Sequence, residues 1–338
     1  MKKHLVGSLK VIIPLGLGIF LVWYYFQGLS NNDINEIVGA FERANYFWVG
    51  ISLVAATLSH LSRAYRWKYP LEALGYKPQF ANSFFSVMIG YLLNLAVPRL
   101  GEVSRCGFMH RYEKIPFEKL LGTVIAERVA DAFILLLSIV AVVFLQYEVI
   151  QDLLNDTLSS MFGNISVAMV FTILIGLGIA GIGGLVFIYR VKSENKIIQS
   201  IQKIMKGLVD GALSIVKMKK KWAFIFHTLF IWTMYVLMFY LCFFSLPETS
   251  HVPFQGVLTA FVLGGITIAA TNGGIGAYPL AVQAILALYG VDKTIAGAFG
   301  WIVWTAQTVM ILVLGALAFT LMPIYNRSRN EKDTVSQA

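Results

Sequence analysis

The chain has 338 residues, of which 57% are hydrophobic and 13% charged, and its formal net charge is +9. A soluble domain has about a quarter of its residues charged, so this composition excludes a soluble fold and requires a large lipid-facing surface. The basic residues lie in loops beside apolar segments, which indicates cytoplasmic membrane loops and argues against a nucleic-acid partner.

Six segments are apolar over the roughly 20 residues that a helix needs to cross a bilayer. In chain order, these predicted spans are Leu9–Leu29, Tyr46–Ser62, Leu120–Gln146, Gly163–Tyr189, Trp222–Leu246 and Ile295–Tyr325. The first follows two lysines, as in a signal peptide, but no small-residue cleavage site comes after it, so we interpret it as a retained span. The pattern predicts an all-α polytopic membrane protein.

Two further apolar regions are interrupted. Phe80–Pro98 contains two asparagines and ends at a proline, and Phe254–Tyr289 is broken at Thr271–Pro279, which holds three glycines. Proline and glycine interrupt helices, so each region is expected to form a re-entrant hairpin. For Phe254–Tyr289, two short spans are the alternative.

Loop charges predict which side of the membrane each connection faces. Acidic residues predominate in the loops predicted to lie outside, which are Asn31–Arg43, Gln146–Phe162 and Leu246–His251. Basic residues predominate in the loops predicted to be cytoplasmic, which are the N-terminus, Arg63–Lys77, Arg99–Lys119, Arg190–Lys221 and the tail at 327–338. Both termini are therefore expected in the cytoplasm.

This order predicts an inverted-topology repeat within one integral membrane domain at 1–338. The halves, 1–150 and 160–326, each contain two spans, one re-entrant hairpin and one span, and they have opposite orientation. Hydropathy and charge alone support the repeat, because the halves show no residue-level similarity. In such folds the broken helices of the two halves meet near the midplane and form the substrate site.

The first candidate site follows the break at Pro98. Arg99 and Arg105 flank Glu102, and Gly101 permits a tight turn. One interpretation is a salt-bridge cluster at a helix end. The other is an anion site, because guanidinium groups match phosphate geometry and stay charged when they are desolvated.

A second candidate lies within the predicted span Leu120–Gln146. Glu127 and Asp131 share a helix face, and Arg128 is within one turn of Asp131. Charges inside a span should face the protein interior. They are either a self-compensated structural triad or carboxylates that carry protons and balance arginines during transport.

Two further candidates are the glycine-rich break and the basic end of the second predicted span. At the break, glycines free backbone amides for an anion, or form a tightly packed hairpin tip; the residues are Asn272, Gly273, Gly274 and Gly276. At the span end, Arg63 and Arg66 with Trp67 are explained by interfacial anchoring or by contact with a lipid headgroup.

Taken in order, these motifs resemble the lysylphosphatidylglycerol synthase transmembrane family, often called the flippase-like domain family. The motifs are Arg63-x-x-Arg66-Trp67, Asn94…Pro98-Arg99-x-Gly101-Glu102-x-x-Arg105, Glu127-Arg128-x-x-Asp131 and Gly273-Gly274-x-Gly276-x-x-Pro279. The resemblance implies a bacterial or archaeal cytoplasmic (inner) membrane protein that moves lipid headgroups between leaflets. Full-length synthases add a soluble aminoacyltransferase domain; only about a dozen residues follow Tyr325 here, so that activity is not expected.

The leading hypothesis is a lipid flippase or transporter that moves an anionic phospholipid or a lipid-linked headgroup, and is not an enzyme. The alternatives are a membrane-embedded enzyme or accessory subunit acting on a lipid-linked intermediate, with Glu127 or Asp131 as acid or base, and a structural envelope partner. The five histidines are scattered without ligand spacing, so no metal or other cofactor is predicted. Membrane lipids are the expected partners.

Overall fold

A computed structural model describes residues 18–97, 99–146, 217–271 and 273–336, with isolated positions at 16, 191, 195, 198–199, 202 and 215. Contacts divide the chain into two compact units, Met1–Val124 with Lys217–Ala338, and Ile125–Val216. The predicted span Gly163–Tyr189 and most of the first half of Leu9–Leu29 lie outside the described residues.

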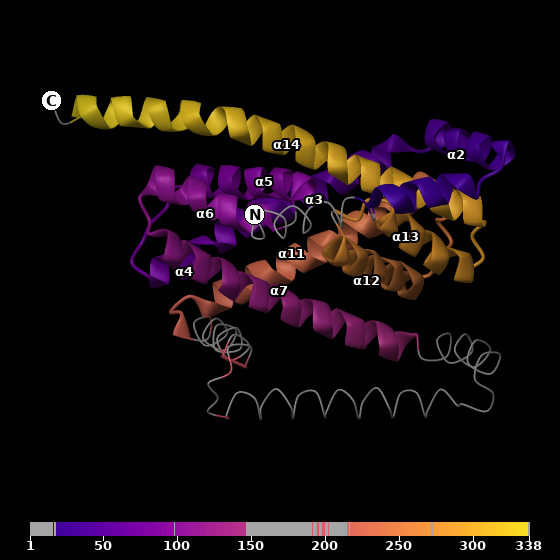
Figure 1. Cartoon of the computed structure of the whole chain (residues 1–338), viewed down its shortest axis with the longest axis horizontal. Helices are drawn as coiled ribbons and strands as arrows, with labels where there is room; N and C mark the ends of the chain where they lie inside the picture. Colours follow the sequence, from indigo (N-terminus) through magenta and orange to yellow (C-terminus); the bar gives the residue numbers. More distant parts are fainter. Residues whose placement is uncertain are drawn as a thin grey trace. The chain divides into compact units, whose positions relative to one another are not determined.

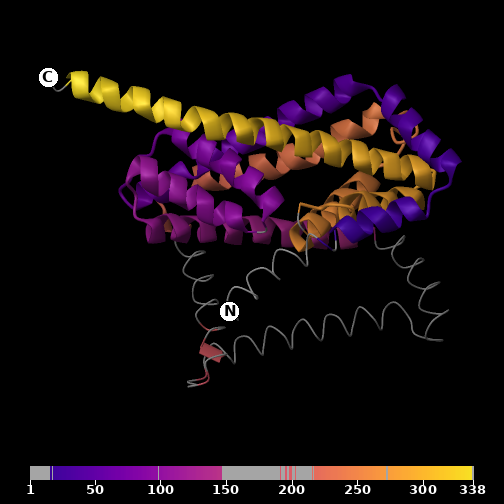
Figure 2. The same cartoon turned by 45° about the horizontal axis from the view of Figure 1, so that its top comes forward.

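Every regular element in the described ranges is helical, as predicted. The elements are α2 (Asn31–Arg43), α3 (Tyr46–Arg66), α4 (Lys68–Ala73), α5 (Phe80–Ala96), α6 (Leu100–Glu113), α7 (Phe117–Leu145), α11 (Lys221–Cys242), the 3₁₀ turn η1 (Phe243–Ser245), α12 (Phe254–Ala270), α13 (Ala277–Leu288) and α14 (Lys293–Ser336). Figures 1 and 2 show α14 running unbroken past α5 and α13, with which it packs.

Three helical segments among the described residues are long and apolar enough to cross a membrane. They are Phe117–Leu145, Lys221–Ser245 and Lys293–Arg327. They coincide with three of the predicted spans. The predicted span Tyr46–Ser62 is also helical, as part of α3, but it falls outside this group because polar residues such as Ser59, His60 and Ser62 lower its hydropathy.

The largest hydrophobic core lies where α11, α13 and α14 pack together with the segment around α2. Aromatic rings dominate its centre: Phe299 lies 4.6 Å from Phe243 and 6.0 Å from Phe239 between ring centroids. All three side chains are fully buried. This core joins residues from both ends of the sequence and includes side chains of α12 and α13 from the interrupted region Phe254–Tyr289.

The expectation that Phe80–Pro98 folds back on itself is wrong, because this region is the single helix α5 up to Ala96. The hairpin is formed instead by α5 and α6, and α6 lies in the segment that was expected to be a loop. A β-carbon at Gly90 would lie 3.0 Å from the carbonyl oxygen of Gly101, so the two backbones approach closely near the turn. At the open end, Asn82 near the start of α5 donates a hydrogen bond to Glu113 at the end of α6. The two ends of this hairpin therefore lie together.

The region Phe254–Tyr289 forms a second hairpin, of α12 and α13. A β-carbon at Gly256 would come within 2.8 Å of the Tyr289 ring, and one at Gly264 within 2.7 Å of the Tyr278 ring. The start of α12 thus packs against the end of α13. The turns of the two hairpins also meet, because a β-carbon at Gly273 would lie 3.1 Å from Cδ2 of Leu95, near the end of α5.

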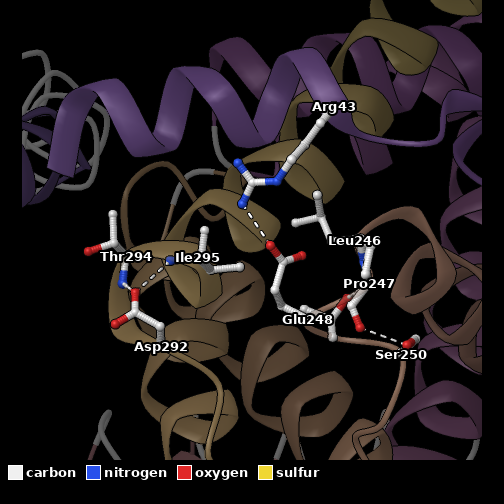
Figure 3. Close-up of polar contacts among 9 residues, drawn as sticks. Arg43, Leu246, Pro247, Glu248, Ser250, Asp292, Thr294 and Ile295 are labelled. Carbon is white, nitrogen blue, oxygen red and sulfur yellow. Dashed lines mark hydrogen bonds and ion pairs between the residues drawn. The ribbon is translucent and has the colours of Figure 1, made fainter. Parts of the chain in front are cut away.

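Ion pairs join loops that the charge pattern predicts to lie on one side of the membrane. Arg43, at the end of α2, pairs with Glu248 after η1 at 2.8 Å, as Figure 3 shows. Both belong to loops predicted to lie outside. Lys220, before α11, pairs with Glu72 of α4 at 2.9 Å, and its hydrogen bond lowers the pKa of Glu72. Both of these belong to predicted cytoplasmic loops.

An ion pair and hydrogen bonds also join the ends of α5–α6 to the segment where α14 leads into the tail. Arg329 donates to Oε1 of Glu113 at 3.3 Å, and Asn326 exchanges hydrogen bonds with Asn82 at 2.7 and 3.0 Å. Glu113 and Arg329 belong to two stretches, Arg99–Lys119 and the tail, that are both predicted to be cytoplasmic.

The membrane topology remains a prediction, and labelling of single cysteines tests it. In a background without Cys106 and Cys242, cysteines at Lys77, Lys114 and Lys206 should react only after the cytoplasmic face is exposed. A cysteine at Glu36 should react from outside and is the matched control. Strong outside labelling at position 114 would contradict the inverted repeat.

Candidate functional site

Two arginines at the end of α3 are buried against α11. Arg63 is 3% exposed and donates from Nη2 to the hydroxyl of Tyr235 at 3.2 Å. Arg66 is fully buried and donates from Nη1 to Thr228 at 2.9 Å, with its guanidinium 5.1 Å from the centre of the Phe224 ring. These two side chains thus face protein, and both interpretations, interfacial anchoring and headgroup contact, stay predictions.

A third buried arginine, Arg105 of α6, stacks on the residue that follows Arg66. Its guanidinium carbon lies 3.8 Å from the centre of the Trp67 ring. Trp67 is itself fully buried and donates from its indole N–H to Thr123 at 2.8 Å. The planar guanidinium matches the ring face, a contact that lysine cannot reproduce. Trp67 thus places Arg105 beside the end of α3.

The break between α5 and α6 is held by Asn94. Its side-chain oxygen accepts the backbone N–H of Gly101 at 2.7 Å, and its amide nitrogen donates to Glu102 at 3.4 Å. Arg99 adopts a left-handed conformation, with φ of 63°, and its side chain is exposed. Arg99 and Arg105 therefore do not flank Glu102 on one continuous helix. Pro98 lies outside the described residues.

The turn between α12 and α13 needs its glycines for conformation and close packing. Gly273, Gly274 and Gly276 all have positive φ, which favours glycine. A β-carbon at Gly276 would lie 2.8 Å from the backbone nitrogen of Val22, in the helix at residues 18–27. Trp304 of α14 donates to the carbonyl of Gly273 at 2.8 Å. Asn272 lies outside the described residues.

The charged residues of α7 belong to the second compact unit. Glu127 and Asp131 are buried at 1% and 8% exposure, one helical turn apart. Arg128 is exposed and approaches Asp131 at 3.9 Å. Burial of both carboxylates agrees with the expectation that charges within a span face the protein interior. Their role as structural triad or transport group remains a prediction.

Sequence reasoning missed three residues beside the buried arginines: His60, Tyr91 and Tyr235. They come from α3, α5 and α11 and are up to 175 positions apart in the sequence. The only local signal was His60, which stands one helical turn before Arg63.

The described helices, of which three are long and apolar enough to span a bilayer, define a multi-pass helical membrane protein. The chain belongs to the family described as the lysylphosphatidylglycerol synthase TM region, which matches residues 11–315. A UPF0104 membrane protein of Methanocaldococcus jannaschii is 27% identical over 139 residues, and the match spans 40% of this chain and 40% of that protein's length. No solved structure matches the chain.

Proposed function

We propose that the protein moves an anionic phospholipid or lipid-linked headgroup across the cytoplasmic membrane. The observation that carries the proposal is the burial of Arg63 and Arg66 at the end of α3 and of Arg105 within α6. Arginine stays charged when it is desolvated, and its fork of N–H groups fits phosphate oxygens. Charged residues inside a membrane domain are rare and costly, and they typically mark substrate pathways or other functional sites.

The two hairpins supply a route for such a headgroup. The helices α5, α6, α12 and α13 have 17, 14, 17 and 12 residues. At 1.5 Å per residue they measure about 18–26 Å, shorter than a hydrocarbon core of about 30 Å. We therefore propose that both hairpins are re-entrant, from opposite sides, and that the turns meeting at Leu95 and Gly273 lie near the midplane, as in inverted-repeat transporters.

An embedded enzyme that acts on a lipid-linked intermediate is the second candidate, because Glu127 and Asp131 are buried carboxylates. Assays of the purified protein in lipid vesicles distinguish a transporter from an enzyme. A transporter changes the leaflet in which a headgroup reacts with an impermeant reagent and leaves lipid masses unchanged. An enzyme produces a lipid of new mass. New lipid masses without headgroup movement would overturn the transporter proposal.

The acidic pair on α7 is proposed to couple headgroup movement to protons. Glu127→Gln and Asp131→Asn should then give folded protein in which lipid movement is lost or its pH profile is shifted, since an amide cannot take up or release a proton. A structural triad instead predicts poor yield, because the interactions that each buried carboxylate makes would be lost. The control is Glu118→Gln, at the exposed start of the same helix.

If both amide variants fold and move lipid with the wild-type pH profile, the acidic pair has no place in the transport site. Melting temperature and the pH dependence of lipid movement, measured on the same preparations, distinguish these results.

A further inference from the structure

His60, Tyr91 and Tyr235 form a compact polar and aromatic cluster between three helices. The His60 ring lies 4.7 Å from the Tyr91 ring and 6.4 Å from the Tyr235 ring between centroids. The two tyrosine hydroxyl oxygens are 3.3 Å apart. Tyr235 also accepts the hydrogen bond from Arg63, so the cluster adjoins one of the buried arginines.

One polar atom in this cluster lacks a protein partner. Nδ1 of His60 is buried and makes no hydrogen bond to any residue that the structure describes, although the residue is only 5% exposed. More than about 90% of buried polar groups in proteins are hydrogen-bonded, so an exception of this kind needs a physical reason. A bound ligand that supplies a hydroxyl group would satisfy this atom.

The cluster also stands next to the meeting point of the two hairpins. Tyr91 lies one helical turn before Asn94, whose side chain holds Gly101 at the break of α5 and α6. Leu95 follows and packs against Gly273 of the other hairpin. A headgroup moving past these turns would pass His60 and the two tyrosines.

The side chains of the cluster favour some headgroups of anionic lipids over others. Tyrosine hydroxyls and a neutral imidazole both donate and accept hydrogen bonds, which suits hydroxyl groups of glycerol or a sugar. An aromatic cluster can also hold an ammonium group, but the guanidinium of Arg63 already lies 5.9 Å from the centre of the Tyr235 ring and repels cations.

We propose that His60, Tyr91 and Tyr235 recognise an uncharged, hydroxyl-bearing headgroup attached to a phosphodiester held by the arginines. This inference rests on the proposed function. The shared ligand chemistry is a phosphodiester with neighbouring hydroxyl groups, found both in phosphatidylglycerol and in polyprenyl phosphosugars.

The experiment uses full-length protein in phosphatidylcholine vesicles that contain either phosphatidylglycerol or phosphatidylserine. Impermeant periodate cleaves the vicinal diol of the first lipid, and an impermeant amine reagent modifies the second. Tyr91→Phe and Tyr235→Phe each remove one hydroxyl group. We expect Tyr91→Phe to slow phosphatidylglycerol movement about three- to tenfold, the effect of one lost hydrogen bond, and to leave phosphatidylserine unchanged. Tyr235→Phe should slow phosphatidylglycerol by at least as much, because it also removes the acceptor of the hydrogen bond from Arg63. Tyr240→Phe, elsewhere on α11, is the control.

Three other results are decisive. Equal movement of both lipids in the wild type and in both tyrosine variants overturns the headgroup inference and leaves the proposed function intact. A third set of vesicles contains a polyprenyl phosphosugar and shows which of the two lipids is the substrate. If it is the phosphosugar, the tyrosine variants should slow the movement of that lipid. If the wild type moves none of the three lipids, the proposed function fails, and the headgroup inference with it.

Discussion

Gly101→Ala is expected to lower the free energy of unfolding by about 3 kcal/mol, the upper part of the usual range for overpacking. A β-carbon at this position would overlap the carbonyl oxygen of Gly90 and lie 2.7 Å from Cγ of Asn94. The neighbour is backbone, so it cannot move aside as a flexible side chain would. The new methyl group would also displace Asn94, which accepts the N–H of Gly101.

Thermal unfolding of the purified protein in detergent measures this effect. Gly107→Ala is the matched control, because it lies on the same helix and a β-carbon there would meet nothing within 4 Å. This control should melt at the wild-type temperature or slightly above it, since alanine favours helix. Indistinguishable melting of Gly101→Ala and Gly107→Ala would mean that α5 and α6 are not in close contact at this point.

Arg105→Gln is expected to reduce movement of anionic lipid about 10- to 100-fold. Loss of a charged hydrogen bond to phosphate is worth about 1.5–3 kcal/mol, which corresponds to that range. Arg105→Lys should recover only part of the activity, because lysine keeps the charge but loses the planar stack on Trp67 and the paired N–H groups. Rates of lipid movement in vesicles and melting temperatures are measured together.

Arg111→Gln is the control for loss of positive charge on α6, since Arg111 is exposed on the same helix. It should move lipid at the wild-type rate. If Arg105→Gln folds normally and also moves anionic lipid at that rate, Arg105 does not contact the headgroup.

Hydropathy and charge placed a hairpin within Phe80–Pro98, but that region is the single helix α5, and it pairs with α6, which was expected to be a loop. They were sufficient to predict the helical class, three of the long apolar helices and the break at Thr271–Pro279. These features depend on local composition, which each segment carries by itself. The left-handed conformation of Arg99 was not predictable in the same way, because arginine has no local preference for it. The contacts next to it come from α5, where Asn94 accepts a hydrogen bond from the N–H of Gly101 and Gly90 approaches Gly101 closely.

The candidate site was only partly predictable, for a related reason. Arg63 and Arg66 looked like surface anchors because basic residues at span ends usually face headgroups. Their burial depends on α11, which lies more than 150 positions later in the sequence and contributes Thr228 and Tyr235. Trp67 looked like an interfacial residue, yet it is buried beneath Arg105 from α6. Whether these side chains are buried or exposed depends on contacts with segments that are distant in the sequence.

The ratio of the rates at which anionic and zwitterionic lipids cross the membrane tests the central claim most directly. The two lipids should carry the same acyl chains, here phosphatidylglycerol and phosphatidylcholine, in vesicles with and without the purified protein. We predict that the protein accelerates the anionic lipid well above the zwitterionic one, and that Arg105→Gln removes most of this difference. Equal acceleration of both lipids, or no acceleration of either, would contradict transport of an anionic headgroup by the buried arginines.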